Sequence, residues 1–146
     1  MIRRHQNQTA AGHRPRPPCR KGAAAVEFAI VAPLFFLLVI GCIEFGRALM
    51  VQQVLTNSSR VGAREAITLT ATESEAVTAA NEFAAAASVT GTTVTVTPNP
   101  STASAGDMIS VTVSVPFSSV SWVPAPWFMG GTTLDATSVM RKEGFE

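Results

Sequence analysis

The residues that most often carry enzymatic chemistry are scarce in this sequence and poorly spaced for it. Both histidines, His5 and His13, lie near the N-terminus, and no tyrosine is present. Beyond residue 43 there is no histidine or cysteine, and the only lysine and aspartates are Lys142, Asp107 and Asp135. These residues offer no imidazole base, no thiol nucleophile and no zinc site of the usual composition. We therefore expect a protein that is not an enzyme and that needs no metal and no cofactor.

The distribution of charge points to a membrane instead. Residues 1–22 contain six bases and no acid, whereas residues 23–146 contain five bases and ten acids, a net charge of −5. A basic head on an acidic body is typical of a membrane protein with a defined orientation. Outside the head, bases are too sparse for a nucleic-acid footprint, and no glycine-rich phosphate loop is present. Neither nucleic acid nor a small-molecule substrate is expected as a partner.

An apolar run long enough to cross a bilayer follows the basic head. From Ala23 to Ile43 every residue is apolar or glycine except Glu27 and Pro33. As a helix this run would be roughly 31 Å long, which matches a hydrocarbon core of about 30 Å. We predict a basic cytoplasmic leader at 1–22, a single transmembrane anchor at 23–43 and an extracytoplasmic domain at 44–146. A buried core helix of a soluble protein is the less favoured alternative.

The glutamate inside the run separates three possible fates of the segment. An ordinary secretory signal has a shorter apolar core and a small-residue cleavage site after it, and neither is found here. A lipoprotein signal is a better alternative, because Val39-Ile40-Gly41-Cys42 is similar to a lipobox with Cys42 as the lipid-bearing residue. The charge and the proline inside the core argue against that alternative. The third fate is cleavage before the run, which leaves the helix in place as an anchor.

The residues around the start of the run favour this third fate. The stretch KGAAAVE, residues 21–27, resembles the processing site of type IV pilin-like proteins, with glycine before the cut and glutamate at the fifth mature position. Cleavage between Gly22 and Ala23 would make Ala23 the new N-terminus. Residues four apart share a helix face, so the new ammonium of Ala23 could neutralise Glu27 in the same chain or in a neighbouring subunit. A glutamate that only snorkels to the interface is the alternative.

The segment from residue 23 to residue 66 is similar to the TadE-like pseudopilins, which are minor pilins of the tight adherence (Flp) pilus system. The matching features are the Ala-Val-Glu-Phe opening, Pro33, the motif Glu44-Phe45-Gly46-Arg47 at the end of the anchor, and the stretch Asn57-x-x-Arg60-x-Gly62-Ala63-Arg64. The C-terminal half fits the family only in its general pattern.

The resemblance implies a structural role in the cell envelope. Members of the family are anchored in the membrane, processed by a prepilin peptidase and needed for pilus biogenesis. For this chain it implies a single-pass protein of the bacterial inner membrane with a cytoplasmic N-terminus, possible association with the pilus, and partners among pilin-like subunits and the inner-membrane pilus machinery. The alternative class is a cell-envelope binding module, either uncleaved or lipid-anchored at Cys42.

The anchor is predicted to continue outside the membrane as a helix over 44–67. Arg60 and Arg64 lie four residues apart on one face, where they are either candidate partner contacts or part of a solvated surface. Gly62 marks either close packing or the fraying end of the helix. In the anchor, Pro33 removes one backbone hydrogen bond and predicts a kink, either a functional weak point or a harmless bend.

The rest of the chain predicts an α+β domain. Thr72-x-x-Glu75 is a capping-box pattern before an alanine-rich helix over 73–88, with Val77, Ala80, Phe83, Ala84 and Ala87 on its apolar face. Alternating Val, Ile, Thr and Ser then predict antiparallel strands at about 92–97 and 108–116, and a third at 132–141. Between the last two, Trp122 and Trp127 lie in a proline-broken aromatic segment with Phe128 and Met129. This segment either fills the core, which we favour, or provides partner or membrane contacts.

Overall fold

A computed structural model describes residues 20–123 and 131–144 of the chain. The chain divides into two compact units, Met1–Leu37 and Leu38–Glu146. The leader up to residue 19 lies outside the described residues, and so do Trp127, Phe128 and Met129. The elements follow one another in the order α1, α2, β1, β2, α3, β3, which confirms the predicted α+β class.

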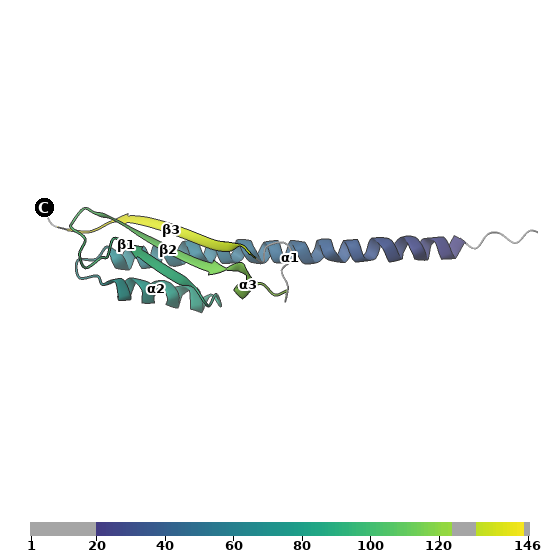
Figure 1. Ribbon diagram of the computed structural model, residues 1–146, viewed down its shortest axis with the longest axis horizontal. Helices are drawn as coiled ribbons and strands as arrows, with labels where there is room; N and C mark the ends of the chain where they lie inside the picture. Colours follow the sequence, from purple (N-terminus) through teal and green to yellow (C-terminus); the bar gives the residue numbers. More distant parts are fainter. Residues whose placement is uncertain (1–19, 124–130, 145–146) are drawn as a thin grey trace, which may run out of the picture. The chain divides into compact units, whose positions relative to one another are not determined.

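Figure 1 shows α1, Arg20–Ala66, as one long helix. The boundary between the two units falls within it, after Leu37. The predicted anchor and its predicted extension are therefore parts of one helical element, which begins at Arg20 rather than at Ala23 and includes Pro33. In the first unit, no described side chain from Gly22 to Leu37 is buried. So many exposed apolar side chains on one helix are stable only in a non-aqueous environment or against a partner.

Helix α2, Glu73–Ala86, begins with the predicted capping box. The backbone N–H of Glu75 donates to the Thr72 hydroxyl oxygen at 3.3 Å, and the backbone N–H of Thr72 donates to a Glu75 carboxylate oxygen at 3.0 Å. Two backbone donors that the helix itself cannot satisfy are thereby paired, which explains why α2 begins at Glu73.

The capping box should make the stability of the second unit depend on pH. The pKa of Glu75 is lowered from its ordinary value of 4.5, because the side-chain hydroxyl and the backbone N–H of Thr72 both donate to its carboxylate. Since the pKa is lower in the folded state, the contribution is present above the unfolded pKa and lost as the pH falls through the folded pKa.

We therefore expect Glu75→Gln to lower the melting temperature at neutral pH and to have progressively less effect below pH 4.5. Thermal unfolding in detergent, followed by circular dichroism at a series of pH values, measures this difference. Glu82→Gln removes a carboxylate from the same helix away from the cap and is the matched control. A melting difference for Glu75→Gln that stays constant with pH would contradict the charge-dependent account.

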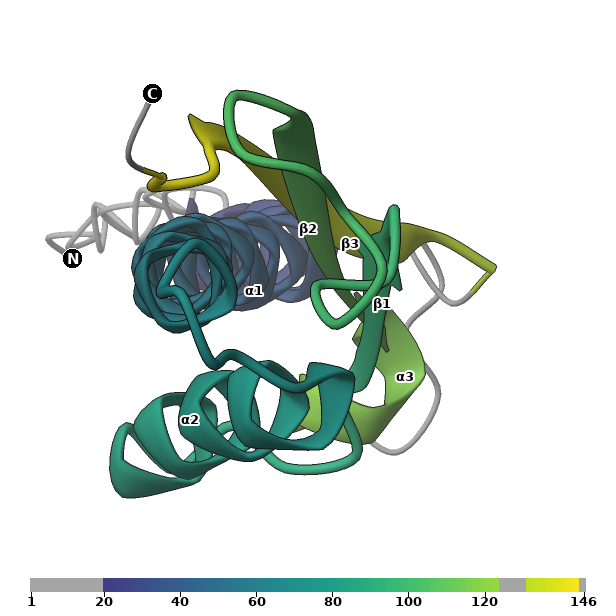
Figure 2. The same cartoon turned by 90° about the vertical axis from the view of Figure 1, so that its left-hand side faces the viewer.

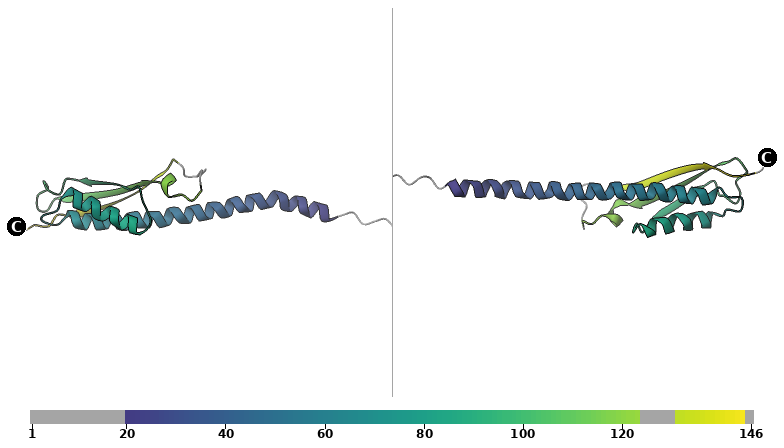
Figure 3. Two further views of the ribbon diagram at one scale, coloured as in Figure 1. Left: turned by 90° about the horizontal axis from the view of Figure 1, so that it is seen from below. Right: turned by 180° about the vertical axis from the view of Figure 1, so that it is seen from behind.

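Three antiparallel strands form the sheet in the order β1-β2-β3. Their bounds are Thr93–Thr97 for β1, Met108–Pro116 for β2 and Thr133–Arg141 for β3. Val96 pairs with Val111 across β1 and β2, and Val111 in turn pairs with Ser138 across β2 and β3. The short helix α3, Phe117–Val120, follows β2 directly at the end of the sheet where β3 begins (Figure 3).

One face of the sheet forms the core of the second unit. In β2, Ile109, Val111, Val113 and Val115 are completely buried, whereas the serine and threonine residues between them are half-buried on the other face. Helix α2 and the part of α1 in the second unit lie on the same side of the sheet (Figure 2). The period of two in the sequence thus separates a core face from a hydroxyl-rich outer face.

Small residues let the two helices approach each other closely. Every fourth residue is small and buried on both helices: Ser58, Gly62 and Ala66 on α1, and Ala76, Ala80 and Ala84 on α2. A Cβ atom built on Gly62 would lie 3.0 Å from the Ala80 Cβ and 3.2 Å from both the Ala76 carbonyl oxygen and the Val111 Cγ1. Of the two interpretations of Gly62, close packing is therefore the correct one.

The structure exposes two aromatic residues that the sequence associates with apolar surfaces. The predicted apolar face of α2 includes Phe83, but its side chain is 38% exposed, and the buried row of the helix consists of the alanines at residues 76, 80 and 84. Trp122 was favoured as a core residue, but it is 71% exposed. Phe117 and Val120 of α3 are buried in the core instead.

Candidate functional site

The predicted processing site lies in the first turn of α1. Gly22, Ala23 and Glu27 are all exposed, and Ala23 and Glu27 are separated by one helical turn on the same face. Four residues of helix correspond to about 6 Å along the axis. An ammonium created at Ala23 would lie at the helix N-terminus, within reach of the Glu27 carboxylate. Processing after Gly22 and charge pairing at Glu27 stay predictions.

The same helix supplies the candidate membrane anchor. Among the residues that the structure describes, one helical segment, Gly22–Ala66, is long and apolar enough to cross a membrane, judged by length and composition. Pro33 lies inside it and removes the N–H that would pair with the carbonyl of Ala29. Cys42, the residue of the alternative lipobox, is an exposed free thiol within α1.

Where the apolar run ends, α1 binds a segment far away in the sequence through two charged side chains. The Ser121 hydroxyl donates to one Glu44 carboxylate oxygen at 2.6 Å, and the backbone N–H of Trp122 donates to the other at 3.3 Å. One turn further, the Arg47 Nε donates to the carbonyl of Val120 at 3.1 Å. These five residues, Glu44, Arg47, Val120, Ser121 and Trp122, are called the exit cluster below.

The exit cluster also contains a contact between a cation and an aromatic ring. The guanidinium carbon of Arg47 lies 5.3 Å from the centroid of the Trp122 ring, within the range of a cation–π interaction. Glu44 and Arg47 thus bind residues 120–122 through their charged groups. They hold the exposed indole of Trp122 beside the first polar turn of α1. All of these contacts lie within the second unit.

Sequence reasoning recognised Glu44 and Arg47 only as part of a family motif. Their partners are 73 to 78 residues away in the chain. A carboxylate and a guanidinium three residues apart after an apolar run are usually exposed to solvent. One signal in the sequence could have indicated these contacts. The two charges lie directly at the predicted membrane boundary, where a bound partner reduces the cost of removing each charged group from water.

The two arginines predicted as candidate partner contacts lie apart from the exit cluster. Arg60 and Arg64 are exposed and one turn apart near the C-terminal end of α1. The neighbouring residues Ser58 and Ser59 are buried and join the core, with the Ser58 hydroxyl bonded to the Ala80 carbonyl at 2.7 Å. Buried and exposed residues therefore follow one another along α1 with the helical period. Both arginines lie on its exposed face, away from α2 and the sheet.

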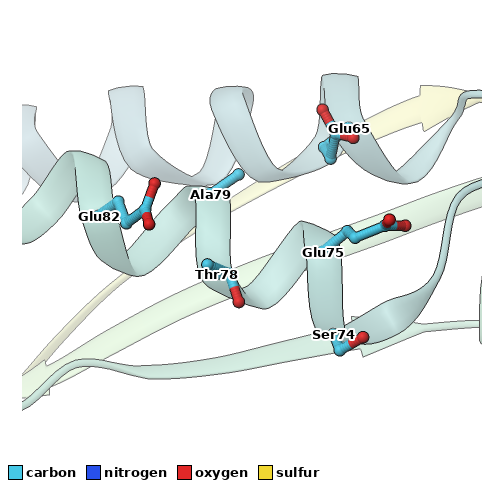
Figure 4. Close-up of a pocket in the computed structure, with 6 residues that line it drawn as sticks. All are labelled: Glu65, Ser74, Glu75, Thr78, Ala79 and Glu82. Carbon is cyan, nitrogen blue, oxygen red and sulfur yellow. The ribbon is translucent and has the colours of Figure 1, made fainter.

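A shallow hollow of about 340 Å³ lies between α1 and α2. Figure 4 shows that Glu65 comes from α1 and that Glu75 and Glu82 come from α2, with Ser74, Thr78 and Ala79 completing its lining. Glu75 is already bound in the capping box. Among the described residues, no group of three His, Cys, Asp or Glu side chains could hold a metal ion.

These observations define first a class of protein: an α+β domain carried by an N-terminal helix that is long and apolar enough for a membrane anchor. Residues 22–64 match the family model described as TadE-like protein. The resemblance seen in the sequence is therefore confirmed for this N-terminal segment, which is similar to TadE-like proteins of the tight adherence (Flp) pilus system. The match covers less than half of the chain and includes the predicted processing site, the apolar run, Glu44 and Arg47. No curated protein and no solved structure matches the chain.

Proposed function

We propose that this protein is a membrane-anchored, minor pilin-like subunit that takes part in the assembly of a tight adherence (Flp) pilus. The observation that carries the proposal is the TadE-like match, which begins at Gly22, the residue before the proposed cut, and extends through the whole apolar run. The match supports a relation to this pilus system. Processing by a prepilin peptidase and the role of the subunit in assembly are the proposed parts.

In this proposal the helix is retained in the bacterial inner membrane as a single-pass anchor. The basic leader is on the cytoplasmic side and the domain at 44–146 is outside, as the positive-inside rule predicts for six bases without an acid. Glu27 lies only about 6 Å from the new N-terminus along the helix axis. There its charge is neutralised by the ammonium of Ala23, either in its own chain or in a neighbouring subunit during assembly.

The proposed role is structural rather than enzymatic. The long-range polar contacts of α1 in the second unit join it to other elements of the same unit. The Gln52 amide donates to the Asp135 carbonyl at 2.7 Å, and the Ser59 hydroxyl lies 2.8 Å from the Ser138 hydroxyl. These contacts hold α1 against β3 and support a rigid domain that is carried by the anchor. The proposed partners are the prepilin peptidase, other pilin-like subunits and the inner-membrane pilus machinery.

N-terminal sequencing of the protein from membranes that contain its prepilin peptidase tests the proposal. We expect the mature chain to begin at Ala23. Gly22→Leu should block cleavage, because the peptidase is proposed to require a glycine before the cut. The folded chain should accept this leucine, since a Cβ on Gly22 has no atom within 4 Å. Gly41→Leu adds the same side chain to the same helix, also in open space, and should leave cleavage unchanged.

Two other results would contradict processing at this bond. A mature chain that retains Met1, or one that begins with an acylated Cys42, would favour the envelope binding module instead. Mass spectrometry of the intact protein distinguishes both from a start at Ala23, because the lost leader and the added acyl chains change the mass differently.

A further inference from the structure

Apolar side chains remain exposed on the second unit just after the apolar run ends. Phe45 is 59% exposed, Leu49 54%, Met50 47% and Trp122 71%. These four residues are called the apolar collar below. Isolated exposed apolar side chains are common in proteins. Three large ones within about two helical turns of the end of an apolar run, with Trp122 held beside them, are a continuation of that run.

The apolar collar covers the sides of α1 that the core leaves open, over about 7.5 Å of the helix axis. With about 100° of rotation per residue, Glu44 lies on the same side of the helix as the core residues Ala48 and Val51, and Arg47 lies next to them. Phe45, Leu49 and Met50 therefore lie on the remaining sides. Trp122 completes the collar on the side of Arg47, where the exit cluster holds it.

The chemistry of this level matches the headgroup region of a bilayer. Tryptophan is enriched at membrane–water interfaces, where its ring lies among apolar groups and its N–H reaches water. The two charges at this level, Glu44 and Arg47, are bound to residues 120–122 and so do not project as free charges. The collar is also continuous in the chain with the candidate membrane span, which favours lipid over a partner protein as its occupant.

We infer that the apolar collar is inserted into the headgroup region of the leaflet that faces α2 and the sheet, and that the exit cluster sets the height of α2 and the sheet above the bilayer by holding Trp122 there. The inference rests on the proposed function, because it requires α1 to be a membrane anchor. It extends that function by assigning the lipid interface as the ligand of Trp122. The boundary of the membrane then lies beyond Ile43, near Met50.

Fluorescence quenching by brominated lipids tests this inference on the full-length chain. The protein is reconstituted into vesicles of phosphatidylcholine and phosphatidylglycerol that carry bromine either near the headgroup or deep in the acyl chain. Trp127→Phe leaves Trp122 as the single tryptophan of the chain. We expect its emission to fall at least twofold with shallow bromine, to fall less with deep bromine, and to be protected from iodide in the water.

Two reporter variants provide matched controls in a Trp122→Phe/Trp127→Phe background. Phe36→Trp lies inside the predicted anchor, seven residues or about 10 Å before Ile43, and should be quenched most by deep bromine. Val139→Trp lies on the outer face of β3. Its neighbour Ser138 contacts Ser59 of α1, which is twelve residues or about 18 Å beyond Arg47. This reporter should be quenched by iodide and unaffected by bromine.

The controls separate failure of the inference from failure of the anchor. If Phe36→Trp is quenched by deep bromine while Trp122 behaves like Val139→Trp, the anchor stands and the interfacial position of the collar is overturned. Trp122 would then face water or a protein partner. If Phe36→Trp is also unaffected by bromine, α1 does not span the bilayer, and the proposed function is overturned together with the inference.

Discussion

Cells that carry Glu27→Gln in this protein are expected to lose pilus assembly while the leader is still removed. Glutamine keeps the size of the side chain but cannot neutralise the ammonium that cleavage creates at Ala23. An unpaired ammonium near the hydrocarbon of the bilayer is costly, and a subunit without its charge partner has lost the proposed contact for recruitment. The expected effect is a near-complete loss of surface pili, with the mature protein present at its normal level.

Electron microscopy of surface pili and N-terminal sequencing of the membrane protein measure the two outcomes separately. Glu27→Asp retains the negative charge on a side chain that is shorter by one methylene group, so it should restore pili at least partly and is the matched control. Normal piliation with Glu27→Gln would remove charge pairing from the proposed mechanism. Failure of cleavage in the same variant would instead place Glu27 in recognition by the peptidase.

The second large effect is expected at Gly62, where α1 and α2 are in contact. A side chain there would meet Ala80, Ala76 and Val111 at 3.0 to 3.2 Å, which is too close for the atoms beyond Cβ. Two of these contacts come from another helix and one from the central strand, so relief would require the whole layer to move. We expect Gly62→Leu to lower the free energy of unfolding of the second unit by about 3 kcal/mol, at the upper end of the usual cost of overpacking.

Thermal unfolding of the full-length protein in detergent, followed by circular dichroism, measures this loss. Gly46→Leu is the matched control, because it adds the same side chain to the same helix at a position with no atom within 4 Å. Leucine is also a better helix former than glycine by up to about 1 kcal/mol, so the control should be neutral or slightly stabilising. Equal melting temperatures for the two variants would contradict close packing at Gly62.

Elements with a local signal could be predicted from the sequence. The alternation of valine with serine and threonine was sufficient to predict the strands, and their observed bounds lie close to the expected ones. Thr72 and Glu75 were sufficient to predict the start of α2, because a capping box joins residues that are only three positions apart. The family resemblance could also be found in this way, since its motifs lie within the contiguous segment 22–64.

Features that depend on distant residues could not be predicted. Phe83 and the alanines of α2 give nearly the same helical periodicity, and only the close approach of α1 at Gly62 selects the alanine row as the buried face. The need of a small domain for large apolar side chains favours a core position for Trp122 over a partner or membrane contact. The structure instead buries Phe117 and Val120 in the core, and the indole is left outside.

The sequence by itself determined the apolar helix, the capped second helix, the three strands and the TadE-like character of the N-terminal segment, because each is encoded in residues that are close together in the chain. Only the tertiary structure decided that Gly62 is a packing site and that Glu44 and Arg47 hold residues 120–122. The physical reason is that these contacts join residues up to 78 positions apart. Their energy depends on how the helices and the sheet fit together, and no local pattern records that fit.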